Sequence, residues 1–88
     1  MKLVCKIRVK NDLGLHIRPA TAIVKLLQNC NCDVTFTHKK EVINAKSILN
    51  ILMLAAKQNS QITITADGED AEQIINKLQN AFENRFGE

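Results

Sequence analysis

Hydrophobic and polar residues alternate in three separate stretches of the chain, residues 2–10, 34–37 and 62–66. Alternation with a period of two predicts β-strands that have one buried and one solvated face. In the first stretch the apolar positions are separated mainly by lysine and arginine, so its outer face is basic; these apolar positions are Leu3, Cys5, Ile7 and Val9. A short fourth strand is predicted around Val42 and Ile43, after a polar turn.

Three other stretches carry apolar residues at the spacing of one helix face, which predicts helices over residues 17–28, 48–56 and 71–84. Pro19 fits the start of the first helix, because proline is tolerated in the first turn, where amides have no intrahelical partner. Ser47 directly precedes the second helix, and serine there accepts a hydrogen bond from a first-turn amide.

The resulting order, βαββαβα, predicts a two-layer α+β domain with three helices on one face of a four-stranded sheet. The other face is expected to be open, and its polar positions are occupied by Thr35, Thr37, Thr63 and Thr65. The 88 residues suit one domain spanning residues 1–88. We expect residues 85–88 to fray.

Bulk composition narrows the class of protein only modestly. A hydrophobic content of 45% and a charged content of 24% are ordinary for a globular domain. The net charge of +3 suits acidic protein partners at least as well as nucleic acid. The sequence shows no long apolar run, so neither a signal peptide nor membrane insertion is predicted. The odd number of cysteines favours reduced thiols in the cytoplasm, with a redox-sensitive Cys30–Cys32 pair as the less favoured alternative.

The second helix is apolar on two faces. One face carries Ile48, Ile51, Leu52 and Ala55. A second face, about 100° away, carries Leu49, Met53 and Ala56. One face belongs to the core of the domain, and the second either docks a partner protein or is buried as well. The pattern alone leaves both alternatives open.

The stretch from Gly14 to Ala20 places His16 at the start of the first helix, two residues before Arg18. The first amides of a helix point outward unpaired and the helix dipole is positive there, so the site attracts anions and disfavours a cationic imidazole. A phosphoryl group carried on a neutral His16 fits this chemistry. The alternative is an exposed loop or capping histidine, which is the commoner role of a histidine before a helix.

The stretch Gly14-Leu15-His16-Ile17-Arg18-Pro19-Ala20 resembles the active-site signature of the HPr family, the histidine-containing phosphocarriers of the phosphoenolpyruvate-dependent sugar phosphotransferase system. The resemblance implies an open-faced β-sandwich with an antiparallel sheet, and a monomer without cofactor or metal ion. It also implies that His16 takes a phosphoryl group on Nδ1 from phosphorylated enzyme I and passes it to enzyme IIA. Arg18 would balance the charge of that group, and the protein would be a carrier and not an enzyme.

A second stretch, Asn44-Ala45-Lys46-Ser47-Ile48-Leu49, resembles the regulatory-serine segment of the same family. This resemblance implies phosphorylation of Ser47 by an HPr kinase/phosphorylase. It also implies that the second helix lies beside His16 and contacts partner proteins. The expected partner-binding residues are Ile17, Thr21, Lys25, Gln28, Ile48, Leu49, Leu52 and Met53.

Two other functions compete with the phosphocarrier. A purely regulatory HPr-like binding module, switched by phosphorylation of Ser47, would use the second site alone. An RNA-binding domain would suit the βαββ order and the basic first strand. RNA-binding sheets of this kind stack bases on exposed aromatic residues, whereas the chain has no Trp or Tyr and places only Phe36 in a predicted strand. The retained histidine and the missing aromatics favour the carrier.

Overall fold

The computed structural model describes residues 1–88 and has the predicted element order. Its strands are β1 (Lys2–Arg8), β2 (Cys32–His38), β3 (Glu41–Asn44) and β4 (Gln61–Gly68). Its helices are α1 (Ile17–Leu27), α2 (Ile48–Leu54) and α3 (Ala71–Glu83), and a short 3₁₀ turn, η1 (Arg85–Gly87), follows α3. None of the helices is long and apolar enough to cross a lipid bilayer.

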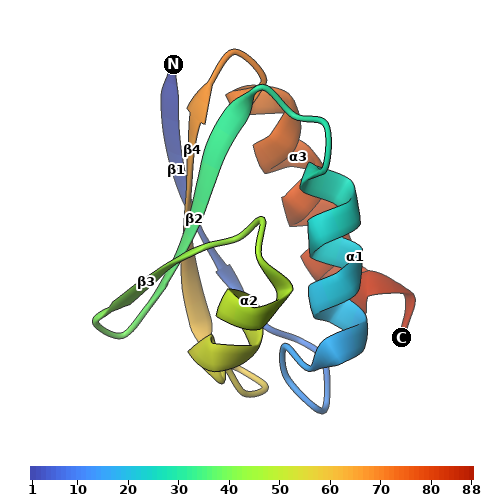
Figure 1. Cartoon of the computed structure of the whole chain (residues 1–88). Coiled ribbons are helices and arrows are strands. Elements are labelled where there is room, and N and C mark those ends of the chain that lie inside the picture. Colours follow the sequence, from blue (N-terminus) through green and yellow to red (C-terminus); the bar gives the residue numbers. More distant parts are fainter.

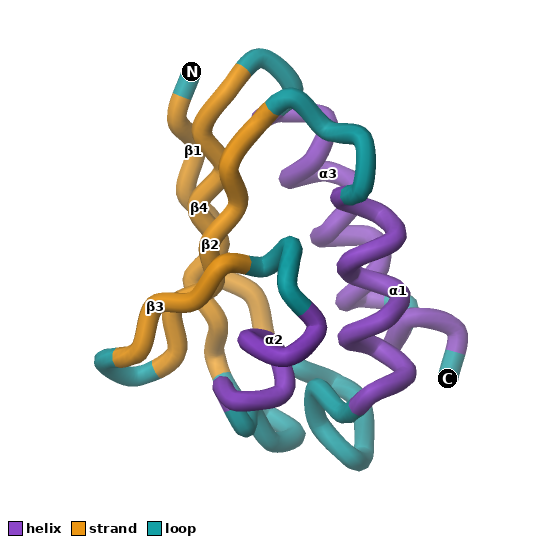
Figure 2. The backbone as a smooth tube through the Cα atoms, in the orientation of Figure 1, coloured by secondary structure: helices purple, strands orange, loops and turns teal.

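The four strands form one antiparallel sheet in the order β1-β4-β2-β3, and the three helices cover one face of it (Figure 1). The tube in Figure 2 separates the two layers, with the strands on one side and the helices on the other. This confirms the predicted α+β open-faced sandwich. The register places Thr35 opposite Thr65 and Thr37 opposite Thr63. All four threonines are half-buried, whereas the strand residues between them are buried beneath the helices.

The hydrophobic core lies between the sheet and the helices. The predicted stripe of α1 is buried at Ala20, Ile23 and Leu27. The rings of Phe36 in β2 and Phe82 in α3 meet edge to face, with centroids 5.9 Å apart and both side chains buried. Phe36 therefore belongs to the core and offers no stacking platform for RNA bases, which removes the only aromatic residue that the RNA-binding interpretation could use.

The second helix is shorter than predicted, because α2 ends at Leu54 and not at Ala56. Ala55 adopts the left-handed conformation (φ 52°), which ends the helix and turns the chain. The following Ala56 is buried, and its carbonyl accepts a hydrogen bond from the amide of Leu15 at 3.0 Å. Two predicted positions are therefore corrected. Ala55, which was predicted on the core face, is exposed, and Leu54 is buried instead. Ala56, which was predicted on the second face, is buried beyond the end of the helix.

The prediction that residues 85–88 fray is also wrong. The ring of Phe86 packs against Phe82 with centroids 4.8 Å apart. The side-chain amide of Asn11 donates a hydrogen bond to the carbonyl of Arg85 at 2.9 Å. An aromatic contact and a hydrogen bond from the loop before α1 therefore hold this segment against the domain.

No disulfide bond links the three cysteines. The sulfur atoms of Cys30 and Cys32 lie 3.4 Å apart. Burial, followed by the hydrogen bond with Cys30, raises the pKa of Cys32 to about 11. Because the thiolate is the reactive form, this high pKa makes Cys32 a poor nucleophile at neutral pH.

Candidate functional site

The loop between β1 and α1 presents His16 at the end of the sheet, and the contact of this loop with the end of α2 sets its path. Gly14 has a φ of +68°, and a Cβ added there would collide with the carbonyl oxygen of Ala56. The amide of Leu15 donates to that same oxygen. Only glycine allows so close an approach, so Gly14 lets the loop lie against the residue that follows α2.

His16 lies at the start of α1, as predicted, in the N-cap position, and its side chain forms no capping hydrogen bond. Its backbone is extended (φ −80°, ψ −170°), and its carbonyl accepts the first helical hydrogen bond, from the amide of Ala20 at 3.0 Å. Pro19 has no amide hydrogen, so the amides of Ile17 and Arg18 are those that the first turn leaves without a helical partner. The imidazole is partly exposed, at 28% of its side-chain surface.

The imidazole contacts a carboxylate that the sequence pattern does not predict. The Nε2 atom of His16 lies 3.0 Å from Oε1 and 2.9 Å from Oε2 of Glu88. The Asn11 side-chain amide also donates a hydrogen bond to Glu88. The one sequence signal for this arrangement was Phe86, an apolar residue four positions after Phe82 that continues the buried face of α3.

The pKa of Glu88 lies below its ordinary value. The hydrogen bond from Asn11 is the largest cause, and the hydrogen bond and charge of His16 and the charge of Arg18 lower it further. The side chain is therefore an ionised carboxylate at neutral pH. The Arg18 side chain is exposed, and its charge is the smallest of the causes that lower this pKa.

An open cleft of about 320 Å³ borders the imidazole. All but one of its lining residues are polar or charged, and they come from the loop before α1 and from the segment after α3: Asn11, Asp12, Leu13, His16, Arg85 and Glu88.

Ser47 is the N-cap residue of α2, which confirms the predicted cap. Its hydroxyl oxygen accepts a hydrogen bond from the amide of Asn50 at 3.2 Å, and the residue is half-buried. Its phosphorylation remains a prediction.

The predicted partner-binding residues lie on α1 and α2, which pack side by side (Figures 1 and 2), except Gln28, which is the C-cap residue of α1. Three large apolar side chains among them are exposed: Ile17 at 64%, Leu49 at 66% and Met53 at 64%. Lys25 and Gln28 are exposed, whereas Thr21, Ile48 and Leu52 are half-buried. Leu13, in the loop before His16, is exposed at 76% and was not predicted as part of this surface.

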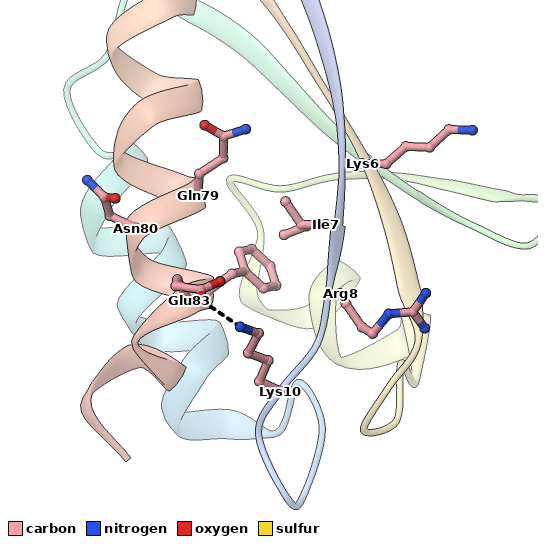
Figure 3. Close-up of a pocket in the computed structure, with 8 residues that line it drawn as sticks. Lys6, Ile7, Arg8, Lys10, Gln79, Asn80 and Glu83 are labelled. Carbon is pink, nitrogen blue, oxygen red and sulfur yellow. Dashed lines mark ion pairs between the residues drawn. The ribbon is translucent and has the colours of Figure 1, made fainter.

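A second groove, between β1 and α3, does not offer comparable chemistry (Figure 3). Its Lys10 forms an ion pair with Glu83 at 2.7 Å, so their charges cancel locally. Lys6 and Arg8 point to the opposite side of β1 from Glu83. The lining of the groove contains no histidine, cysteine, serine or threonine that could carry a phosphoryl group.

Comparisons with known proteins agree with the fold. Residues 4–84 match the family model described as "PTS HPr component phosphorylation site". The chain is 49% identical over 80 residues to phosphocarrier protein HPr of Chlamydia pneumoniae, covering 91% of this chain and 74% of that protein. Two solved structures, both 32% identical, are similar throughout. HPr-C-His from Thermoanaerobacter tengcongensis has a TM-score of 0.93 and covers 98% of this chain and 97% of its own. HPr from Bacillus anthracis has a TM-score of 0.87, with 92% and 96% covered. The chain therefore belongs to the HPr family of phosphocarriers of the phosphotransferase system.

Proposed function

We propose that this protein accepts a phosphoryl group on Nδ1 of His16 from phosphorylated enzyme I and passes it to an enzyme IIA. The observation that carries the proposal is the position of His16 at the N-terminus of α1, with Nε2 engaged by Glu88. Nδ1 is the ring nitrogen that makes no hydrogen bond within the chain. The histidine thus combines an unengaged ring nitrogen with the helix end that attracts anions.

The transfer needs positioning and electrostatic stabilisation more than acid–base chemistry. The lone pair of Nδ1 forms the new bond to phosphorus, while the bond from phosphorus to the donor breaks and its electron pair stays with the donor. The negative oxygens of the transferring group are stabilised by the amides of Ile17 and Arg18 and by the Arg18 guanidinium. No small-molecule substrate is converted, so the protein acts as a reversible carrier.

The partner surface in this proposal surrounds His16. The exposed side chains of Ile17, Leu49 and Met53 supply apolar contact, and Arg18 and Lys25 supply positive charge. An acidic, partly apolar face on enzyme I or enzyme IIA complements this surface. The whole chain, residues 1–88, acts as one HPr domain in the cytoplasm, where these partners work.

Incubation with enzyme I and phosphoenolpyruvate, followed by native mass spectrometry, tests the proposal. We expect one acid-labile phosphoryl group on the parent protein and none on His16→Ala. His38→Ala is the matched control, because His38 is the only other histidine and is the last residue of β2. It should be labelled like the parent. Equal labelling of the His16→Ala and His38→Ala variants would remove His16 from the mechanism.

We further propose that phosphorylation of Ser47 by an HPr kinase/phosphorylase regulates this transfer. The supporting observation is the place of Ser47 at the start of α2, close in sequence to the exposed Leu49. A phosphate adds about −1.5 to −2 charge at pH 7. The helix terminus tolerates that charge, but a partner would have to desolvate it and would meet it with its own carboxylates.

A stopped-flow comparison of Ser47→Asp and Ser47→Ala across a salt series tests the regulatory proposal. Ser47→Ala loses the hydrogen bond to the Asn50 amide and should cost about 1 kcal/mol of stability, with little effect on transfer. Ser47→Asp should keep the fold but accept the phosphoryl group more slowly, and added salt should recover part of the rate by screening repulsion. Matching rates for both variants would leave Ser47 as a helix cap.

A further inference from the structure

We propose that Glu88 is a positioning residue that holds the imidazole of His16 in the tautomer protonated on Nε2, so that Nδ1 presents its lone pair. The inference rests on the proposed transfer at His16 and adds to it the residue that selects the reacting nitrogen. The contact between the segment after α3 and the loop before α1 carries it.

The direction of the hydrogen bond follows from the chemistry of the two groups. Both oxygens of Glu88 lie within hydrogen-bond distance of His16 Nε2, at 3.0 and 2.9 Å. An ionised carboxylate has no hydrogen to donate, so the shared hydrogen is carried by Nε2. A neutral imidazole has a single N–H, and its other nitrogen, Nδ1, then holds a free lone pair.

Glu88 is held in place by a buried anchor. The side chain of Asn11 is 1% exposed, and its Nδ2 atom donates to the carbonyl of Arg85 at 2.9 Å and to the carboxylate of Glu88. Both acceptors are oxygen atoms, so the amide must face them with its NH₂ group. The other side of the Asn11 amide, Oδ1, is buried without a partner. The amide therefore places the carboxylate at the cost of an unsatisfied oxygen.

The backbone of the segment also indicates a held conformation. Arg85 and Phe86 both have left-handed φ values, 54° and 53°. Non-glycine residues adopt this region rarely, and two in succession persist only where surrounding contacts hold them. The packing of Phe86 on Phe82 and the Asn11 hydrogen bonds are those contacts.

The same carboxylate suits the phosphorylated state. Once Nδ1 is bonded to phosphorus and Nε2 keeps its hydrogen, the ring carries a positive charge. Glu88 is the carboxylate in contact with that N–H and balances this charge, while Arg18 and the amides face the phosphoryl oxygens. Asp12 and Arg85 are the other charged residues that line the cleft. Because the pKa of Glu88 is lowered, the contact exists at neutral pH and is lost as the pH falls through that lowered value.

Nitrogen NMR of protein labelled with ¹⁵N-histidine tests the tautomer without any partner. At a pH where the ring is neutral, we expect two well-separated His16 shifts, one for a protonated Nε2 and one for an unprotonated Nδ1. In Glu88→Gln the side chain still accepts from Asn11, but its NH₂ group can also donate to Nε2, so the two shifts should converge. Glu83→Gln, which removes a carboxylate paired with Lys10, is the matched control and should leave the shifts unchanged.

Phosphorylation by enzyme I gives the second readout. At metal sites, loss of the hydrogen-bond partner that orients a ligand histidine costs about 10–100-fold. By analogy, Glu88→Gln should slow labelling about tenfold while Glu83→Gln matches the parent. Converged shifts with slow labelling support the proposal. An unchanged tautomer in Glu88→Gln, or labelling at the parent rate or faster, overturns it. If the shifts converge in Glu88→Gln but the parent protein is not labelled at all, the transfer at His16 is refuted. In that case Glu88 sets the tautomer, but the tautomer has no role in phosphoryl transfer.

Discussion

Replacement of Gly14 by alanine tests how the loop before His16 is held. Gly14 has a φ of +68°, and an alanine Cβ there would collide with the carbonyl oxygen of Ala56. That oxygen accepts the hydrogen bond from the amide of Leu15. The substitution should therefore strain the backbone and push apart the two segments that place His16.

The expected loss is the sum of two effects. An L-residue in the left-handed region costs about 1–2 kcal/mol. Lengthening the 3.0 Å hydrogen bond between Leu15 and Ala56 costs about 1 kcal/mol more. For a domain of 88 residues, with a stability of roughly 4–13 kcal/mol, a total of about 2–3 kcal/mol is a large fraction. It corresponds to a fall in melting temperature of roughly 10–20 °C.

Thermal unfolding followed by circular dichroism measures this loss, with Gly87→Ala as the control. Gly87 also has a positive φ, of +83°, but a Cβ added there meets open space. Gly87→Ala should therefore show the backbone strain without the collision, and about half the fall in melting temperature. If Gly14→Ala is no more destabilising than Gly87→Ala, the contact with Ala56 does not constrain the loop.

Three other substitutions or reactions test separate parts of the structure. Arg18→Ala should slow phosphorylation by enzyme I about tenfold, the equivalent of one lost charge-assisted hydrogen bond. The rate of Arg18→Lys should lie between those of Arg18→Ala and the parent. A parent-like rate for Arg18→Ala would show that Arg18 is only a solvated side chain. Leu49→Glu should weaken binding to enzyme I, measured by calorimetry, with a stability change within about 0.5 kcal/mol, whereas Leu54→Glu, at a buried position, should unfold the protein. Because the pKa of Cys32 is raised to about 11, roughly one thiol in a thousand is ionised at pH 8, and its alkylation rate should rise about tenfold per pH unit toward pH 11. A plateau near pH 9 would show an ordinary thiol.

The element order was predictable because strand and helix periodicities are local properties of the chain. Pro19 marked the start of α1, and Ser47 marked the start of α2, where its hydroxyl accepts from Asn50. Each of these signals involves residues within one helical turn. For the same reason, the position of His16 at a helix N-terminus follows from its immediate neighbours in the sequence.

The limits of the local signals appear at the end of α2. Ala55 and Ala56 are good helix formers, and the apolar pattern continues through them, so the sequence predicts helix there. The structure places Ala55 in the left-handed region and uses the carbonyl of Ala56 to bind the loop at Leu15. A contact between segments about 40 residues apart decided this boundary, and helix propensity is too weak a preference to resist it.

The surroundings of the His16 imidazole depend still more on the tertiary structure. The sequence determined that a histidine and an arginine stand at the start of a helix, where the first two amides lack helical partners. It carried no local sign that Glu88, 72 residues away, would meet Nε2. Only the packing of α3 against the sheet and α1 brings residues 85–88 back to the loop before α1, where buried Asn11 receives them. The sequence thus supplied the histidine and the anion-attracting helix end, because both arise within one turn of chain. The tertiary structure alone supplied the carboxylate, because that contact is set by how distant elements pack.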